Sequence, residues 1–262
     1  MISNYFALNH IISPNLNLEK FFILSNKLKI KFIEIRNDLP KIDLSKIEPA
    51  YVKDLTIKHN IELISINALQ KFNIWDRKRE KELLYLCDFA KKCDVKAIVL
   101  VPLNTGEFTE KNERVNLLNN SLKKINLILN DFNLLGYIEP LGFATSSLRY
   151  KSEVAKIINN SLSCSSLRIL HDTFHHELAE EKQVFSNLTG LVHISGISNN
   201  KIQKVNMRDN DRELIDANDV LNNLDQIIKL KKNGYEGLFS FEPFSKKIQN
   251  LSNSHEEILK SI

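Results

Sequence analysis

The chain has 262 residues, of which 43% are hydrophobic and 26% charged, and its formal net charge is only +4. These proportions are ordinary for a globular domain, and the basic residues lack the clustering that nucleic-acid binding requires. No apolar run reaches the roughly 18 residues of a membrane span, so no membrane partner is expected. The N-terminus lacks a secretory signal, and the three cysteines lack metal-ligand spacing. We therefore expect a cytoplasmic protein with reduced thiols.

Short apolar runs alternate with longer amphipathic segments from one end of the chain to the other. Helical spacing of apolar residues predicts helices that include 83–90, 117–129 and 220–230. Glycine is scarce, with 7 in the chain, so asparagine is expected at helix ends, because it tolerates the left-handed conformation. The apolar runs predict strands at 6–11, 32–36, 61–67, 97–102, 137–141, 168–172, 191–194 and 238–242.

The alternation of strands and helices indicates the fold class. It implies parallel strands joined by right-handed helical crossovers, and eight such units in a chain of this length predict an α/β fold, the (β/α)8 TIM barrel. An open doubly wound sheet is the alternative, and its nucleotide-binding form has a glycine-rich turn after the first strand. Residues 9–14 contain no glycine, and no linker divides the chain, so we expect a single barrel domain over residues 1–262.

Four polar residues stand where predicted strands end in the second half of the chain. They are Glu139, Asp172, His193 and Glu242. The C-terminal ends of barrel strands meet at one mouth, where barrel enzymes carry their catalytic residues, so the four side chains are expected to converge there. A carboxylate at the end of a buried strand is costly unless it is paired or coordinated. A structural ion pair is the alternative for either glutamate alone, whereas all four residues together favour a metal site.

Three carboxylates and one imidazole form a hard, oxygen-rich ligand set. Such a set suits one divalent ion, with Mn2+ as the first expectation and Mg2+, Co2+ or Zn2+ as alternatives. A metal chelated by a ketone oxygen and the adjacent hydroxyl oxygen would acidify the C–H bond between them. One glutamate could then remove that proton to give a cis-enediolate. Return of the proton at the other carbon, or on the other face, would give an isomer or an epimer.

Several histidines accompany these ligand candidates. His175 follows Asp172 by three residues and could donate a hydrogen bond to a substrate oxygen. Strand alternation directs its neighbours His171 and His176 to other faces, which favours packing or surface positions for them. A lone histidine in an apolar run is usually a core residue, but the three carboxylates favour His193 as a ligand.

Polar and aromatic residues near the second and third predicted strand ends are weaker candidates. Glu34 and Arg36 end the second strand, where they could reach the mouth or form a structural salt bridge. Asn67 ends the third strand and is a further candidate for substrate binding. Phe72 and Trp75 lie in the loop that follows, where they could wall a pocket or pack in the core.

The motifs taken together resemble a known family. Residues 32–40, 66–73 and 101–105 follow the second, third and fourth predicted strands, and the four ligand motifs come after them in order. In this order and approximate spacing, the segments resemble the sugar isomerase/epimerase family of xylose-isomerase-like TIM barrels. Within that family the chain is most similar to the inosose isomerases (2-keto-myo-inositol isomerases) of inositol catabolism, and the likeness runs over nearly the whole chain.

The resemblance implies that the four residues above bind the metal and that both glutamates act as acid/base groups. It implies substrate contact for His175, and it implies that Arg212, in the loop after the seventh strand, binds substrate oxygens. In many relatives this arginine is followed by Pro-Gly-x-Gly, whereas residues 212–219 read Arg-Glu-Leu-Ile-Asp-Ala-Asn-Asp. The loop that covers the substrate therefore departs from the family. A homodimer is a further expectation from the resemblance.

Competing functions differ in chemistry or in class. The first is an isomerase or epimerase of a small keto-sugar or inosose, and the second is an inosose dehydratase that expels a β-hydroxyl group from the same site. An abasic-site endonuclease of this fold would need a trinuclear zinc cluster with more histidines, which His10 and His59 do not supply. A non-catalytic sugar-binding barrel is the third alternative. No glycine-rich phosphate grip is present, so an unphosphorylated substrate is expected.

Overall fold

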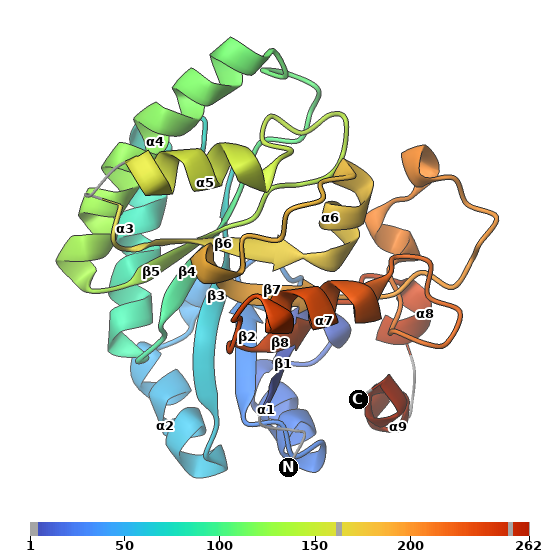
Figure 1. The fold of residues 1–262 in the computed structure, drawn as a ribbon. Helices are drawn as coiled ribbons and strands as arrows, with labels where there is room; N and C mark the ends of the chain where they lie inside the picture. Colours follow the sequence, from blue (N-terminus) through green and yellow to red (C-terminus); the bar gives the residue numbers. More distant parts are fainter. Residues whose placement is uncertain (1–4, 161–163, 251–253, 262) are drawn as a thin grey trace.

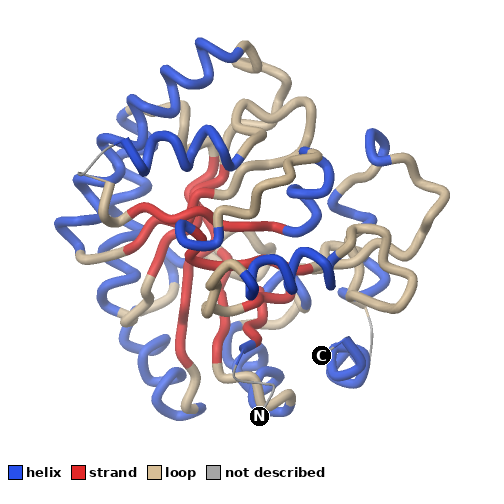
Figure 2. Tube along the Cα trace, in the orientation of Figure 1, coloured by secondary structure: helices blue, strands red, loops and turns tan. Residues whose placement is uncertain are grey.

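The computed structural model describes residues 5–160, 164–250 and 254–261, which form a closed barrel of parallel strands surrounded by helices (Figures 1 and 2). Each strand pairs with the next in the chain, and the last closes on the first, with Ser240 opposite Ala7. This confirms the predicted fold class. The strands are β1 (Phe6–Asn9), β2 (Phe32–Arg36), β3 (Glu62–Gln70), β4 (Ala97–Val101), β5 (Leu135–Ile138), β6 (Leu167–Asp172), β7 (Thr189–Ile194) and β8 (Phe239–Phe241).

The helices follow the strands one by one and cover the outside of the barrel (Figure 1). Short 3-10 turns occupy the loops, namely η2 (His10–Ile12), η3 (Leu44–Lys46), η4 (Ser186–Leu188), η5 (Lys204–Asn206) and η6 (Asp209–Asp211). None of the helices in the described ranges combines the length and hydrophobicity that a bilayer crossing requires. The helices are α1 (Leu18–Lys27), α2 (Pro49–His59), α3 (Arg77–Lys92), α4 (Lys111–Phe132), α5 (Lys151–Asn160), α6 (Thr173–Ala179), α7 (Asn223–Lys232), α8 (Lys246–Gln249) and α9 (Ser254–Ser261).

The start of α7 differs from the predicted helix boundary, because polar contacts hold the preceding residues in another conformation. The helix predicted over 220–230 begins only at Asn223, because the Asp219 carboxylate accepts hydrogen bonds from the backbone N–H groups of Leu221 and Asn223. The backbone N–H of Val220 donates to the carbonyl of Ile197 in the preceding loop. These bonds hold the end of the β7–α7 loop in a non-helical path.

Asparagine ends helices in place of glycine, as the composition predicted. Asn60 and Asn133 follow α2 and α4 with φ of 49° and 57°, in the left-handed region. In each case the backbone N–H of the asparagine donates to carbonyls of the last helical turn. Asparagine adopts this conformation more readily than other residues with a side chain, so the chain turns sharply toward the next strand.

The strands are apolar on both faces, as parallel strands covered by helices must be. Outward residues such as Ile33, Ile98 and Val192 belong to the large core between the barrel and its helices. Inward residues toward the N-terminal ends of the strands form a separate cluster, so the barrel interior is a packed core and not a pore. The buried members of that inner cluster are Ala7, Ile64, Ala68, Ala97, Val99, Tyr137, Leu170 and Leu191.

Candidate metal centre

The inward face of the barrel changes from apolar to polar toward the C-terminal ends of the strands. Residues two apart on a strand share a face. In three places an apolar inward residue is followed, two positions later, by a polar one. Leu170 is followed by Asp172, Leu191 by His193, and Tyr137 by Glu139. Glu139 and Glu242 lie just after their strands, and their backbone N–H groups donate to strand carbonyls of Leu100 and Ile194 at 3.0 and 2.9 Å. Strand alternation therefore places these side chains in one polar layer.

Four side chains of this layer converge, as the sequence predicted. One ligand atom from each of Glu139, Asp172, His193 and Glu242 lies within 4.8 Å of all the others. All four residues are buried, with at most 4% of their surface exposed. Nδ1 of His193 lies 3.0 Å from Oε2 of Glu242 and 3.3 Å from Oε1 of Glu139. The donor set and its close spacing fit a divalent cation.

The two nitrogens of His193 have different surroundings. Nε2 lies 3.0 Å from Oε1 of Glu34, which is fully buried beneath the cluster. Nδ1 is buried and has no hydrogen-bond partner with acceptable geometry within the described ranges, although two carboxylates lie close to it. A proton held on Nε2 by Glu34 leaves the Nδ1 lone pair directed at the other three ligand candidates, which is how a metal-binding histidine is oriented.

Two buried arginines compensate part of the negative charge. Nη2 of Arg212 lies 2.6 Å from Oδ2 of Asp172 and 2.9 Å from Oε2 of Glu242. Nη1 of Arg36 lies 2.9 Å from Oε1 of Glu242. With Glu34 and Glu139 included, four carboxylates face two guanidinium groups in this buried layer. With a neutral His193 the carboxylates of this layer outnumber its guanidinium groups, and a divalent cation would offset that excess, which supports the fit of the site to a metal.

The surroundings shift the pKa values of the cluster in opposite directions. Burial raises the pKa of Glu139, and the neighbouring Glu242 carboxylate raises it further. Burial also opposes ionisation of Glu242, but the charges of His193 and Arg212 outweigh it and hold the pKa well below its usual range. Burial disfavours the His193 cation, yet the carboxylates of Glu242 and Glu34 raise its pKa well above the ordinary value. The two glutamates are thus chemically unequal.

His175 lies beside the cluster on the first turn of α6. Asp172 caps this helix, because its Oδ1 accepts a hydrogen bond of 3.0 Å from the backbone N–H of His175. The His175 side chain is buried, and its Nδ1 has no hydrogen-bond partner in the part of the chain that the structure describes. The ring stands edge-on to Phe143, with centroids 5.1 Å apart. One residue, Asp172, therefore positions both the ligand layer and this histidine.

His171 and His176 pack away from the ligand layer, in agreement with the packing alternative. Their Nδ1 atoms lie 2.8 and 2.7 Å from Nζ of Lys151, a buried residue at the start of α5. Nε2 of His171 lies 2.9 Å from Oε1 of Gln226 on α7. Burial lowers the pKa of Lys151 to about 7, which suits an amine that donates to two imidazoles.

Glu34 and Asn67 lie closer to the ligand layer than to the rim of the mouth. Glu34 accepts hydrogen bonds from Asn9, Ser65 and Ser240 in addition to its contact with His193. This geometry favours a role in holding His193 over the substrate contact expected from the sequence. Nδ2 of Asn67 lies 3.4 Å from Oε1 of Glu242.

The structure adds Asn9 to the site, which the sequence did not predict, and it decides between pocket wall and core packing for Phe72 and Trp75. Asn9 ends β1 and donates to both Glu34 and Glu242 at 3.2 Å. Its signal was available, since it is a polar residue directly after an apolar run at the start of the chain. Phe72 lies in the core around the barrel, and Trp75 packs against it, so both follow the packing alternative.

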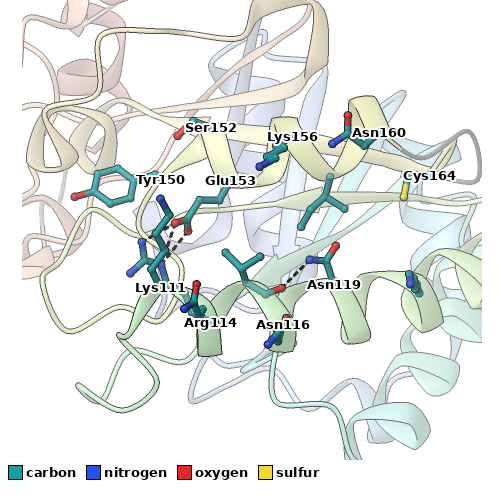
Figure 3. A pocket seen from close by; sticks show the side chains of 14 residues that line it. Lys111, Arg114, Asn116, Asn119, Tyr150, Ser152, Glu153, Lys156, Asn160 and Cys164 are labelled. Atoms are coloured by element: carbon teal, nitrogen blue, oxygen red, sulfur yellow. Dashed lines mark hydrogen bonds and ion pairs between the residues drawn. The ribbon is translucent and has the colours of Figure 1, made fainter.

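A surface groove of about 940 Å3 lies between α4 and α5, away from the ligand cluster (Figure 3). Arg114 and Glu153 form an ion pair of 2.6 Å at one end, and Lys111 and Tyr150 lie beside them (Figure 3). None of the predicted site residues lines this groove. The groove therefore lies apart from the predicted site residues.

Comparisons with known proteins agree with this architecture. Residues 23–262 match the family described as Xylose isomerase-like TIM barrel. No functionally curated protein matches the sequence. A solved protein from Salmonella typhimurium LT2, described as xylose isomerase domain containing, is 30% identical with a TM-score of 0.90, and the alignment covers 98% of this chain and 95% of that chain.

Two more distant structures share the fold. The IOLI protein, solved with a bound zinc atom, is 22% identical with a TM-score of 0.87, over 98% of this chain and 96% of that one. A D-psicose 3-epimerase from Clostridium cellulolyticum H10, solved with D-tagatose, is 14% identical with a TM-score of 0.73, over 98% and 96% of the two chains. The family match extends over most of this sequence, and the chain therefore belongs to the xylose isomerase-like TIM barrel family.

Proposed function

We propose that the protein is a divalent-metal-dependent isomerase or epimerase of a small keto-sugar or keto-polyol of the inosose type. One observation carries the proposal: glutamates from β5 and β8 meet at the same buried cluster as an aspartate and a histidine. Two carboxylates at one site are what a reaction needs when it removes a proton from one carbon and returns it elsewhere. The family match and the likeness to a D-psicose 3-epimerase support this class of reaction.

The ligands of the metal would be Glu139, Asp172, His193 and Glu242. When bound, the cation would polarise the substrate carbonyl and acidify the neighbouring C–H bond. The hard ligand set suits Mn2+, and the zinc atom in the IOLI structure makes Zn2+ the main alternative. Glu34 would keep the proton of His193 on Nε2 and so keep Nδ1 available for the cation.

The protein's own groups would carry the protons. One of Glu139 and Glu242 would remove the proton next to the carbonyl, and the other would return it, with a cis-enediolate between the two steps. Their unequal surroundings support this division, because Arg36 and Arg212 contact Glu242 while the pKa of Glu139 is raised. The glutamate that returns a proton must carry one beforehand, so the two glutamates exchange protons with solvent between turnovers.

Other residues would hold the substrate. Nδ1 of His175 is buried without a partner among the described residues, so it can hydrogen-bond a substrate hydroxyl group. Arg212 and Arg36 carry further N–H groups at the same layer, and phenylalanine rings lie against their guanidinium planes. Guanidinium groups fixed in this way favour an oxyanion that develops on the substrate.

The test is proton exchange in D2O, followed by NMR on Mn2+-loaded protein with a panel of inososes and ketohexoses. We expect deuterium next to the carbonyl of at least one ketone, and loss of this exchange after EDTA. Glu139→Gln and Glu242→Gln should each abolish exchange while metal still binds. Glu62→Gln is the matched control, because its carboxylate is exposed and pairs with Lys31 at the surface.

The products distinguish the competing chemistries. A rearranged or epimerised ketone supports the proposal, whereas loss of water would indicate a dehydratase on the same site. Wild-type exchange in both glutamine variants would refute the acid/base assignment. Absence of exchange with every ketone, in protein shown to hold metal, would refute this substrate class and favour a binding protein.

A further inference from the structure

A second groove lies on the loops next to the metal centre. Its volume is about 960 Å3, and it lies among the loop after β5, the end of α6 and the long β7–α7 loop. Phe143, Arg149, Leu178, Lys204, Arg208 and Asp209 are among its lining residues. We call it the rim groove. A volume of this order is sufficient for a small-molecule ligand.

The rim groove adjoins the site, because side chains that line it also contact residues of the site. The Phe143 ring lines the groove and contacts the ring of His175. Asp209 also lines the groove, and its Oδ1 lies 3.2 Å from Nη1 of Arg212. The same guanidinium contacts Asp172 through Nη2, so one side chain separates the groove from the ligand layer.

Arg149 provides a third connection. Besides the groove, it lines a small cavity of about 10 Å3 that Asp172 and His175 also border. A space of this size holds about one water molecule. Arg149 thus borders both the space beside Asp172 and His175 and the rim groove, so the far end of a substrate bound at the two glutamates would pass Phe143 and Arg149 to reach the groove.

Some charged side chains of the rim groove form ion pairs and others do not. Asp209 is paired with Arg212, and Lys204 lies 2.6 Å from Glu177 and 3.7 Å from Glu180. Within the described ranges, the guanidinium groups of Arg149 and Arg208 form no ion pair with a carboxylate. The groove therefore presents two guanidinium groups that form no ion pair among the described residues, beside one further carboxylate in its lining, that of Glu180.

Backbone contacts fix both guanidinium groups while leaving N–H donors free. Nη2 of Arg149 donates to the Leu178 carbonyl at 2.9 Å, and its Nε is buried without a partner among the described residues. Nη1 of Arg208 donates to the carbonyls of Val205 and Met207 at 2.9 and 2.8 Å. Guanidinium groups held in this way are suited to bidentate recognition of an oxyanion.

From these contacts we propose that the rim groove binds the non-reacting end of the substrate, and that this end carries an anionic group, a carboxylate or a phosphate. The inference rests on the proposed isomerase or epimerase function and narrows its substrate class to acidic keto-sugars. The expectation of an unphosphorylated substrate rested on the lack of a glycine-rich loop. Arginine side chains bind such groups without that loop.

The test compares ketoses that differ only at the far end. D-fructose, D-fructose 6-phosphate and D-fructuronate present a hydroxyl, a phosphate and a carboxylate there, and D-tagatose with its 6-phosphate and tagaturonate forms a second series. For exchange in D2O we expect kcat/KM of an anionic member to exceed that of the neutral one by about tenfold or more, the effect of one charge-assisted hydrogen bond. The better anion identifies phosphate or carboxylate as the group.

The double variant Arg149→Gln/Arg208→Gln should reduce this preference to a ratio near one. Arg168→Gln is the matched control, because Arg168 also donates from Nη1 to two backbone carbonyls but lies on β6 away from the mouth, and it should keep the preference. Equal kcat/KM for neutral and anionic ketoses, or an unchanged preference in the double variant, would overturn the proposal.

Calorimetric binding of the same compounds separates this proposal from the proposed reaction. If no ketose exchanges, the reaction has failed for this panel, and binding decides the role of the groove. Binding of an anionic member that the double variant loses would support the rim groove. No binding of any anionic member to the wild-type protein would overturn it.

Discussion

Replacement of Glu34 by glutamine tests the local design of the metal centre. Glu34 is fully buried, and its two oxygens accept hydrogen bonds from Asn9, Ser65 and Ser240 as well as contacting Nε2 of His193. Glutamine has nearly the same shape, but it places an NH2 donor where the neighbouring groups also donate. At least one buried contact is then lost, and His193 is no longer held in one tautomer.

The size of the effect follows from the position of Glu34 behind the histidine. Removal of a carboxylate that orients a metal-binding histidine lowers metal affinity by about 10- to 100-fold, or about 1.4 to 2.8 kcal/mol. We expect this loss in calorimetric titrations of Glu34→Gln with Mn2+ and with Zn2+. The control Glu62→Gln should bind metal like the wild type, because the Lys31–Glu62 pair is 45% and 47% exposed and contributes little.

A different result would refute this reasoning. Unchanged metal affinity with a raised KM would mean that Glu34 contacts the substrate, as the sequence suggested, and that its bond to His193 has no influence on the metal. Thermal unfolding of both variants should accompany the titrations, so that a loss of metal affinity is not mistaken for a loss of fold.

Three further predictions concern the metal, a buried lysine and a glycine contact. Mn2+ should raise the Tm of the wild type but not of His193→Ala; an equal rise in both would exclude His193 as a ligand. Burial lowers the pKa of Lys151 from 10.5 to about 7, so the unfolded chain binds more protons between these values. Burial of the charged Lys151 amine therefore destabilises the fold fully below about pH 7, and less as pH rises toward 10.5. In denaturant titrations, the free energy of unfolding of the wild type relative to Lys151→Met should increase by up to about 5 kcal/mol over this range. A difference independent of pH would contradict the burial of this amine. In Gly142→Ala the new Cβ would clash with the His175 carbonyl oxygen and lie 2.7 Å from Leu178 Cβ, so we expect the free energy of unfolding to fall by about 1 to 3 kcal/mol in chemical denaturation. Ala144→Ser, at a nearby exposed position, is its control, and equal stability of the two variants would argue against this close packing.

The sequence by itself determined the elements and much of the ligand layer. Apolar runs separated by helical periods are sufficient to predict parallel strands, and a period of two along a strand decides which residues share a face. The convergence of four side chains could be predicted for this reason, because each is the last of the alternate strand residues that face the barrel interior. They are Glu139, Asp172, His193 and Glu242. The use of asparagine at the ends of α2 and α4 could also be predicted, because it depends only on the backbone conformation of one residue.

Only the tertiary structure decided how these residues are paired. Contacts between β1 and β8, such as that of Asn9 with Glu242, depend on the register at which the barrel closes, and no local pattern encodes it. The same register places Glu34 behind His193 rather than at the rim. Burial of Lys151 beside His171 depends on how α5 packs against β6, and the rim groove depends on loops whose paths are set by distant contacts. Local periodicity determines the direction of a side chain, whereas its neighbours across the barrel are determined by long-range packing.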